Sequence, residues 1–244
     1  MITVSHLRKT FGKVTALRDV SFQAEDGRVT GLLGPNGAGK TTTLRILYTL
    51  LRPDSGTAAV DGADVTRQAL EVQRSIGALP DSKGLYPRLT ARENIRYYGE
   101  LQGLSGRRLE ERIGALADLL EMENILDRRT EGFSTGERMK VAIARALIHD
   151  PRNILLDEPT SGLDVMSTRS MRAFIRRLRD EGKCVLYSSH VMQEVSALCD
   201  TIVVISNGAV VIEGSAEQLL RATGQTSLED AFVAALGSGE GLQQ

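Results

Sequence analysis

The sequence has few cysteines and no excess of positive charge. Its two cysteines, Cys184 and Cys199, form no CxxC pair and have no metal-type spacing, which argues against a disulfide framework and a zinc site. We interpret both as structural thiols in a reducing cytoplasm. The chain carries 30 basic and 31 acidic residues, for a net charge of −1. This balance disfavours a nucleic-acid-binding surface.

The sequence also lacks long apolar runs. The longest, such as TIVVI at 201–205, fall far short of the roughly 20 residues that a membrane-spanning helix needs. The first residues, MITVSHLRKTFG, show no basic segment followed by an apolar one, so no signal peptide is indicated. We therefore expect a cytoplasmic protein. If it works at a membrane, another polypeptide must cross the bilayer.

The order of the predicted elements indicates an α/β fold. Short alternating runs near the start predict an N-terminal antiparallel β subdomain, and apolar runs at 29–33, 153–157 and 183–189 predict buried strands. Helical patterns separate these runs, so the core should be a mostly parallel sheet with flanking helices. Hairpins are predicted at 56–65 and, with an Asn-Gly turn, at 201–214.

A mainly helical insertion interrupts the predicted core. The pattern from 68 to 126 is mostly helical, and Thr90 with Glu93 forms a capping box at the start of one helix. We expect a single domain over residues 1–244. Its core comprises 1–73 and 151–244, and its helical subdomain comprises 74–150.

A glycine-rich loop carries the strongest chemical signal. The segment GPNGAGKT at 34–41 matches the phosphate-binding pattern G-x-x-x-x-G-K-[ST] at every fixed position. Gly37 and Gly39 let backbone N–H groups turn inward, and the following helix directs its positive end at the phosphates. Lys40 should contact the β- and γ-phosphates, and Thr41 should hold Mg²⁺. A chance glycine turn is the alternative, which the preceding strand and following helix disfavour. The expected ATP contacts here are Gly34, Pro35, Asn36, Gly37, Ala38, Gly39, Lys40, Thr41 and Thr42.

The loop indicates a P-loop NTPase core. Two further strand ends in this core carry candidate catalytic residues. Asp157 and Glu158 follow the apolar run NILL, at the edge where α/β sheets bind ligands. Asp157 would hold Mg²⁺, and Glu158 would act as general base on the attacking water. His190 follows the next buried run and could reach the γ-phosphate or that water. The alternatives are an acidic turn after a strand and a structural histidine.

Two more segments have a functional and a structural interpretation. Phe11 could stack on adenine, or it could be a core or hairpin aromatic. In FSTGERMKVAIARAL at 133–147, Ser134 could be a simple N-cap. Alternatively, Ser134 and Gly136 could cover the γ-phosphate held by a second copy of the chain, because a helix N-terminus binds anions.

Taken together, these motifs resemble the ATP-binding subunits of ABC transporters, over about residues 3–236. FSTGE at 133–137 takes the place of the family signature, usually LSGGQ, and residues 161–164 match the loop that crosses the dimer interface. His190 matches the family's switch histidine, and Phe11 its adenine-stacking aromatic. The resemblance implies ATP and Mg²⁺ as cofactors and catalytic roles for Lys40, Glu158 and His190. It also implies five further ATP contacts: Phe11, Ser134, Thr135, Gly136 and Glu137.

The sequence departs from the family pattern at one position that matters for the metal. After SIGALP, Asp81 stands where the family usually has glutamine. A carboxylate can coordinate Mg²⁺. The expected metal ligands are therefore Thr41, Asp157 and Asp81.

Residues 79–95 and 227–237 resemble a narrower group, the NatA-type ATPases of bacterial sodium exporters. That resemblance implies an exporter-type (ABC-2) ATPase on the inner face of the cell membrane, with a separate transmembrane permease subunit. It also implies a second ATPase subunit, in an ATP-bound homodimer. Coupling to the permease would involve residues 82–89 of the helical insertion.

Other functions are open at this stage. The ATPase subunits of drug, lipid or polysaccharide exporters show the same motifs. Soluble ABC ATPases of DNA repair carry long insertions, and those of translation carry two cassettes; neither feature is present. A module that holds ATP without turnover is disfavoured by the intact Lys40, Asp157, Glu158 and His190.

Overall fold

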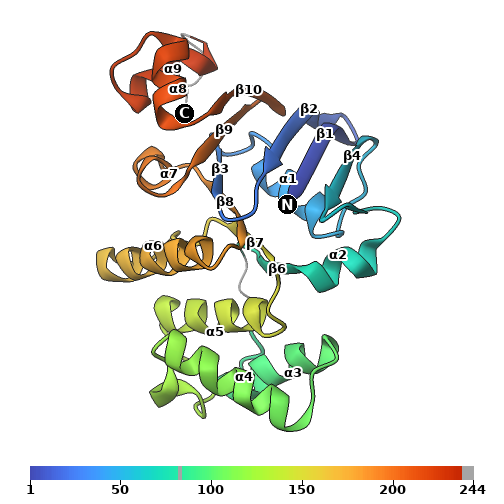
Figure 1. Cartoon of the computed structure of the whole chain (residues 1–244), viewed down its shortest axis with the longest axis vertical. Coiled ribbons are helices and arrows are strands. Elements are labelled where there is room, and N and C mark those ends of the chain that lie inside the picture. Colours follow the sequence, from blue (N-terminus) through green and yellow to red (C-terminus); the bar gives the residue numbers. More distant parts are fainter. Residues whose placement is uncertain (82–83, 238–244) are drawn as a thin grey trace.

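A ten-stranded sheet forms the centre of the computed structural model, which describes residues 1–81 and 84–237 (Figure 1). The strand order is β5-β4-β1-β2-β10-β9-β3-β8-β7-β6. The strands are β1 (Ile2–Phe11), β2 (Val14–Ala24), β3 (Val29–Leu33), β4 (Ser55–Val60), β5 (Ala63–Asp64), β6 (Ile76–Leu79), β7 (Asn153–Asp157), β8 (Cys184–Ser189), β9 (Thr201–Ser206) and β10 (Ala209–Gly214).

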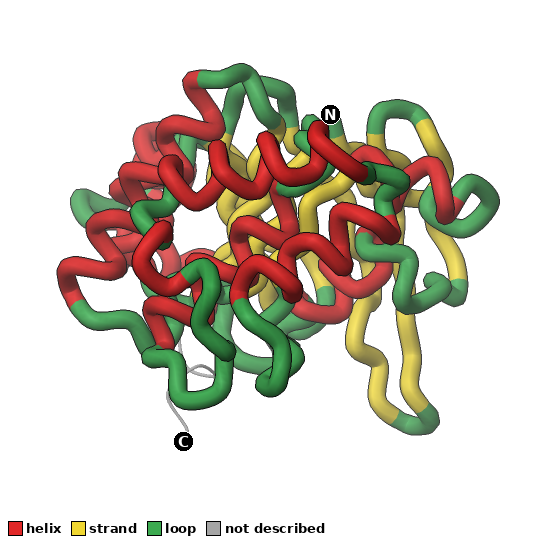
Figure 2. Tube along the Cα trace, turned by 90° about the horizontal axis from the view of Figure 1, so that it is seen from below, coloured by secondary structure: helices red, strands yellow, loops and turns green. Residues whose placement is uncertain are grey.

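Helices surround this sheet, and seen from below they lie in front of the strands (Figure 2). They are α1 (Lys40–Leu47), α2 (Ala69–Ser75), α3 (Ala91–Leu101), α4 (Gly106–Leu119), α5 (Thr135–Leu147), α6 (Val165–Asp180), α7 (Met192–Leu198), α8 (Ala216–Thr223) and α9 (Leu228–Leu236), with a short 3₁₀ helix at Glu123–Ile125. Among the described residues, no helix is long and apolar enough to cross a membrane.

The sheet has an antiparallel half and a parallel half. Strands β1, β2, β4 and β5 pair antiparallel, whereas β9, β3, β8, β7 and β6 run parallel. One pair, Ala209 with Asp19, joins the two halves across β10 and β2. Every residue of β3, β7 and β8 is buried, as expected for parallel strands covered on both faces. These features confirm the predicted α/β fold with its N-terminal antiparallel region.

The predicted hairpins are confirmed. Asn207 and Gly208 both have positive φ, 48° and 76°, in the turn between β9 and β10. Asp61 and Gly62 have φ of 50° and 85° in the turn between β4 and β5. A two-residue turn with positive φ at both positions matches the right-handed twist of the strands that it joins.

The helices α3, α4 and α5 gather at one end of the molecule, beyond β6 (Figure 1). The predicted capping box starts α3, because Glu93 N donates to Thr90 Oγ1 at 3.1 Å and Thr90 N donates to Glu93 Oε2 at 2.8 Å. Helix α4 buries Leu109, Ile113 and Leu116 toward its neighbours. The boundaries of a helical subdomain at 74 and 150 stay a prediction.

Two elements differ from the sequence-based expectation. Residues 76–79 lie in a stretch predicted to be mostly helical, but they form β6, which pairs in parallel with β7. This run is too short to show a helical period, and its pairing partner lies more than 70 residues away. Helix α8 was not predicted; Ser215 and Gln218 start it with a capping box. The two cysteines form no disulfide; Cys184 is buried and Cys199 is half-buried.

Candidate active site

The phosphate-binding loop lies between β3 and α1. Gly37 and Gly39 have φ of 80° and 112°, in the region that favours glycine. A Cβ on Gly39 would come within 2.6 Å of the Leu17 side chain and 2.9 Å of the Ala16 carbonyl oxygen, so no larger residue fits. A Cβ on Gly37 would meet no atom within 4 Å. The loop backbone at Gly37 is therefore open to a ligand.

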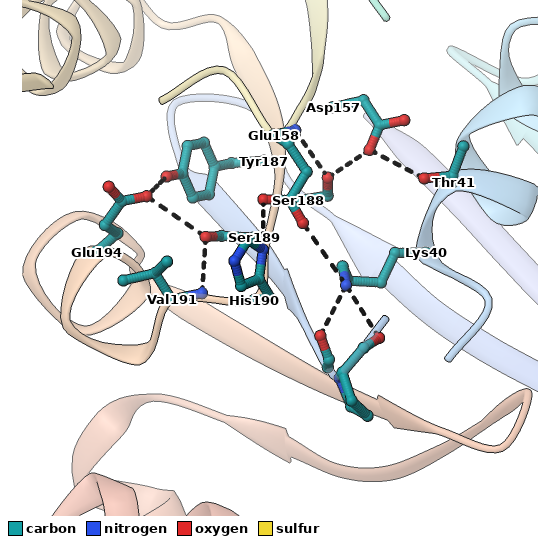
Figure 3. A network of polar contacts seen from close by, with 12 residues as sticks. Lys40, Thr41, Asp157, Glu158, Tyr187, Ser188, Ser189, His190, Val191 and Glu194 are labelled. Atoms are coloured by element: carbon teal, nitrogen blue, oxygen red, sulfur yellow. Dashed lines mark hydrogen bonds and ion pairs between the residues drawn. The ribbon is translucent and has the colours of Figure 1, made fainter. Parts of the chain in front are cut away.

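Lys40 begins α1 and bends back over this loop (Figure 3). It is 6% exposed, and its Nζ donates to Gly34 O at 2.7 Å and to Pro35 O at 3.2 Å. Glu158 Oε1 lies 3.6 Å from the same nitrogen. Burial lowers the pKa of Lys40, an effect that the nearby Glu158 carboxylate opposes. The charge of Lys40 is thus held by carbonyl oxygens and one carboxylate.

Hydroxyl groups organise Asp157 at the end of β7 (Figure 3). Asp157 is buried, and its Oδ1 accepts from Ser188 Oγ at 2.7 Å and from Thr41 Oγ1 at 3.3 Å. Ser188 Oγ also accepts from Glu158 N at 3.1 Å. Asp157 and Ser188 face each other because β7 and β8 pair in this register. Ser188 thereby fixes both predicted acidic residues.

Glu158 lies between two basic groups (Figure 3). Its Oε2 is 3.0 Å from His190 Nδ1, and its Oε1 faces Lys40. Its φ of 49° is uncommon for a residue with a side chain. A strained backbone at this position indicates that the surrounding contacts determine where the carboxylate points.

A cavity of about 350 Å³ opens over these groups. Its lining brings together most of the predicted site: Asn36, Gly37, Ala38, Gly39, Lys40, Thr41, Thr42, Asp81, Glu158, Ser161 and His190. Gly34 and Pro35 contribute their carbonyl oxygens to Lys40 instead. Sequence reasoning gave no role to Ser188, and only strand register could have revealed it.

The remaining predicted residues lie elsewhere. The described residues that line this cavity include neither Phe11 nor residues 134–137. Phe11 ends β1, is 45% exposed, and has Lys9 Nζ 5.6 Å from its ring centroid. Within one chain, the structure does not bring these segments into the phosphate-binding cavity.

Ser134 caps α5, as the structural interpretation of the sequence predicts. Glu137 N donates to Ser134 Oγ at 3.2 Å, and Ser134 N donates to Glu137 Oε2 at 2.8 Å. The hydrogen bond from the Ser134 backbone lowers the pKa of Glu137, and Arg128 lies 3.1 Å from the other carboxylate oxygen. This capping box leaves Ser134 and Thr135 exposed at the helix start.

Comparisons with known proteins agree with this geometry. Residues 17–161 match the family model described as ABC transporter. The chain is 46% identical over 244 residues to ABC transporter ATP-binding protein NatA of Bacillus subtilis (strain 168), covering 98% of this chain and 99% of the relative. It is 38% identical to doxorubicin resistance ATP-binding protein DrrA of Mycobacterium tuberculosis (strain ATCC 25618 / H37Rv), covering 97% of this chain and 75% of that one.

The solved structures include a similar bacterial cassette. It is the dimeric structure of a post-hydrolysis state of an ATP-binding cassette bound to ADP and Pi, with 26% identity and a TM-score of 0.81. The match covers 88% of this chain and 98% of that structure. With the phosphate-binding loop, Glu158 and His190 around one cavity and Asp157 bonded to Thr41 of that loop, these likenesses identify the chain as an ABC ATPase, a member of the ATP-binding subunits of ABC transporters.

Proposed function

We propose that this chain hydrolyses Mg-ATP with Glu158 as general base, at a site that a second copy completes, and so drives a separate membrane subunit. One observation carries the assignment of the base. Glu158 lies beside the phosphate-binding loop with one oxygen toward Lys40 at 3.6 Å and the other toward His190 at 3.0 Å. A carboxylate held in this way can accept a proton from water at the same edge of the sheet.

The loop at 34–42 fits the phosphates of ATP. It offers open backbone at Gly37, the N-terminus of α1 and the Lys40 ammonium around one cavity. Lys40 would exchange its carbonyl partners for phosphate oxygens. That exchange would also release Glu158 from its ion pair, so nucleotide binding itself would free the base to act.

The oxygen atoms next to this loop fit Mg²⁺. The hydroxyl of Thr41 and a carboxylate oxygen of Asp157 lie 3.3 Å apart, and both are ligands that hard cations prefer. Asp81 lines the same cavity and is the third proposed ligand. When bound, Mg²⁺ would neutralise charge on the phosphates. Ser188 would keep Asp157 in place for this role.

The segments outside the cavity would act in a dimer. Residues 134–137 present a hydroxyl, exposed backbone and a helix N-terminus that, in their own chain, contribute nothing to the cavity lining. They would cover the γ-phosphate held by the partner subunit. The similar cassette bound to ADP and Pi is a dimer, which supports this arrangement. Phe11, exposed at the end of β1, would stack on adenine.

A transmembrane permease would be the coupled partner, and this chain would bind to it on the inner face of the cell membrane. The likeness to NatA over nearly the full length of both chains supports membership of the NatA-type group, and we propose sodium export because the resemblance to that group implies it. The runner-up is a drug exporter, which the lower identity to doxorubicin resistance protein DrrA supports less well.

Size-exclusion chromatography of Glu158→Gln with Mg-ATP tests the proposal. Without the base, hydrolysis should stop and the ATP-bound dimer should accumulate, whereas wild type should elute as a monomer. The matched control is the double variant Glu158→Gln with Ser134→Arg. The arginine side chain would occupy the surface at 134–137 that is proposed to cover the partner's nucleotide, and the phosphate-binding loop at 34–42 stays unchanged. That double variant should bind ATP as a monomer. A dimer that Ser134→Arg does not disturb would contradict the proposed role of residues 134–137. Retained ATP hydrolysis in Glu158→Gln would contradict the assignment of the base.

A further inference from the structure

A buried carboxylate outside the cavity gathers three hydroxyl groups. Glu194, in the first turn of α7, is 7% exposed. Its Oε2 accepts from Tyr187 Oη at 2.5 Å and from Ser189 Oγ at 3.4 Å (Figure 3). The same oxygen accepts from Thr160 Oγ1 at 2.5 Å. Burial raises the pKa of Tyr187, which keeps its phenol protonated as a donor. A buried hydrogen-bond network of this kind restricts the positions of its members.

Two of these donors belong to the segments that carry the catalytic side chains. Thr160 lies two residues after Glu158, in a turn closed by the hydrogen bond from Ser161 N to Glu158 O at 3.1 Å. Ser189 immediately precedes His190. Ser189 Oγ also accepts from the backbone N of Val191 at 3.0 Å, so this hydrogen bond joins the residues on either side of His190. One carboxylate oxygen therefore connects the segment after β7 with the last residue of β8, next to His190.

A second link joins the same two strands closer to the sheet. Ser188 bridges Asp157 and the backbone of Glu158, where β7 and β8 are still paired. Beyond that point β7 has ended and Ser189, the last residue of β8, pairs with Leu33 of β3, so the pairing of β7 with β8 no longer holds the two segments together. The contact of 3.0 Å between Glu158 and His190 forms there, between the Ser188 link and the Glu194 link.

We propose that Glu194 is a positioning residue for ATP hydrolysis, which holds the segments of Glu158 and His190 in register so that the carboxylate and the imidazole meet. This inference rests on the proposed role of Glu158 as base. Glu194 itself would touch neither ATP nor water. A misplacement of about 1 Å in a catalytic group can lower a rate by about a hundredfold, so a link of this kind affects turnover more than binding.

The charge of Glu194 is also matched. Arg172 on α6 has its Nη2 3.9 Å from Glu194 Oε1. Breaking a buried charged network usually destabilises a protein, so loss of stability alone would not identify a positioning role. A variant is needed that removes one hydrogen bond to Glu194 without separating the two segments. Tyr187 provides it, because its ring lies within β8, where Leu156 of β7 pairs with it. Its hydroxyl also lies 3.3 Å from Thr160 Oγ1, but Thr160 and Ser189 keep their own hydrogen bonds to Glu194 when that hydroxyl is removed.

The experiment measures kcat and KM for Mg-ATP in four variants of the full chain: Glu194→Ala, Glu194→Gln, Thr160→Val and Tyr187→Phe. Glu194→Ala and Thr160→Val should lower kcat by about 10- to 100-fold while KM stays within about threefold. Glu194→Gln should restore most of the activity, because its amide oxygen can accept the same hydroxyls. Tyr187→Phe should lower the melting temperature and leave kcat within about twofold of wild type.

Hydrogen exchange of the nucleotide-free variants provides a readout that needs no turnover. Exchange in residues 158–164 and 189–192 should be faster in Glu194→Ala and Thr160→Val than in wild type, and unchanged in Tyr187→Phe. Equal loss of kcat in Thr160→Val and Tyr187→Phe, or unchanged kcat and exchange in Glu194→Ala, would overturn the inference. Glu158→Gln tests the role of Glu158 separately. Full activity in that variant would contradict the assignment of Glu158 as base, but it would not contradict the link that Glu194 makes.

Discussion

Lys40 shows what a single charge contributes at this site. Its ammonium is nearly buried, and burial lowers its pKa from the ordinary value of 10.5. A lowered pKa means that the folded state disfavours the charged form. At neutral pH, where the group is protonated in both states, burial of this charge therefore lowers the free energy of unfolding by its full amount. This destabilisation disappears as the pH rises from the folded pKa toward 10.5.

We predict that Lys40→Met abolishes ATP hydrolysis and does not lower the melting temperature at pH 7, because the variant removes a buried charge. Its stability relative to wild type should fall as the pH rises toward 10, since the wild type then loses the charge as well. Calorimetry at several pH values checks this. A drop of more than about 4 °C at pH 7, equivalent to roughly 1 kcal/mol or more, would contradict it.

At the residue scale, the sequence predicted the groups that belong to compact motifs. The loop residues, Asp157 and Glu158 are recognisable because a strand end and a helix start stand next to them in the chain. Ser188 and Glu194 are not, because their partners lie 31 and 34 residues away. Their importance depends on which strands pair and in which register, which local patterns do not specify.

At the scale of one element, α5 combines a structural and a functional demand. Its capping box uses Ser134 and Glu137, the same residues that are proposed to face the partner's nucleotide. The carboxylate of Glu137 stabilises the helix start, where negative charge is favourable. The same charge would lie close to a phosphate in the dimer, where it would be unfavourable. Arg128 offsets part of it.

We predict that Glu137→Gln lowers the ATP concentration at which the Glu158→Gln variant dimerises, by about two- to tenfold, because one repulsive charge is removed. Sedimentation against ATP concentration measures this. An unchanged or higher ATP requirement would contradict the placement of α5 at the partner's nucleotide.

The same substitution should have a small, pH-dependent effect on stability. The pKa of Glu137 is lowered in the folded state, so its contribution is present above the ordinary value of 4.5 and is lost as the pH falls through the folded pKa. Because the Glu137 side chain is still 27% exposed to solvent, which screens its charge, we expect Glu137→Gln to lower the melting temperature by only about 1–2 °C at pH 7, a loss that disappears in acid.

Helices and strands could be predicted from the sequence where neighbouring residues carry a capping or turn signal. Capping boxes and positive-φ turns, as at Thr90 and at Asn207 with Gly208, were recognisable from neighbouring residues. Strand β6 was not, because four residues between a helix and Pro80 carry no period. Its strand geometry comes from pairing with β7. Tertiary pairing thus overrides local preference in the shortest elements.

At the scale of the whole molecule, an exposed aromatic pair lies on the surface formed by the predicted coupling segment, residues 82–89, and α3. Tyr86 and Tyr97 are 45% and 41% exposed, and their rings meet edge to face at 5.6 Å. The backbone of Tyr86 is fixed, because its N donates to Asn94 Oδ1 at 2.9 Å and its O accepts from Thr130 Oγ1 at 2.9 Å. A rigid backbone with an exposed ring suits contact with another protein. Ser82 and Lys83, in the same predicted coupling segment, lie outside the described residues.

We predict that Tyr86→Asp uncouples transport from ATP hydrolysis: in membrane vesicles that contain the chain and its permease, export, measured with the proposed substrate sodium, should be lost while basal ATPase activity stays unchanged. A charge on this ring position would oppose docking without reaching the nucleotide cavity. Tyr86→Phe, which keeps the ring, should transport normally. Equal loss of ATPase activity and transport in Tyr86→Asp would show that Tyr86 acts on the nucleotide site instead. Wild-type export of doxorubicin in place of sodium would favour the drug-exporter alternative.

The position of β3 has a consequence for biosynthesis. In the sheet β3 lies between β8 and β9, yet roughly 150 residues separate it from β8 in the chain. A ribosome adds about 5–20 residues per second, so this interval lasts roughly 10–30 s. During that time the apolar strand VTGLL has neither neighbour, and the nucleotide loop has no Glu158 or His190 beside it. A nascent chain therefore cannot assemble its catalytic site until β7 and β8 have left the ribosome, and β3 gains its second sheet neighbour only when β9 follows.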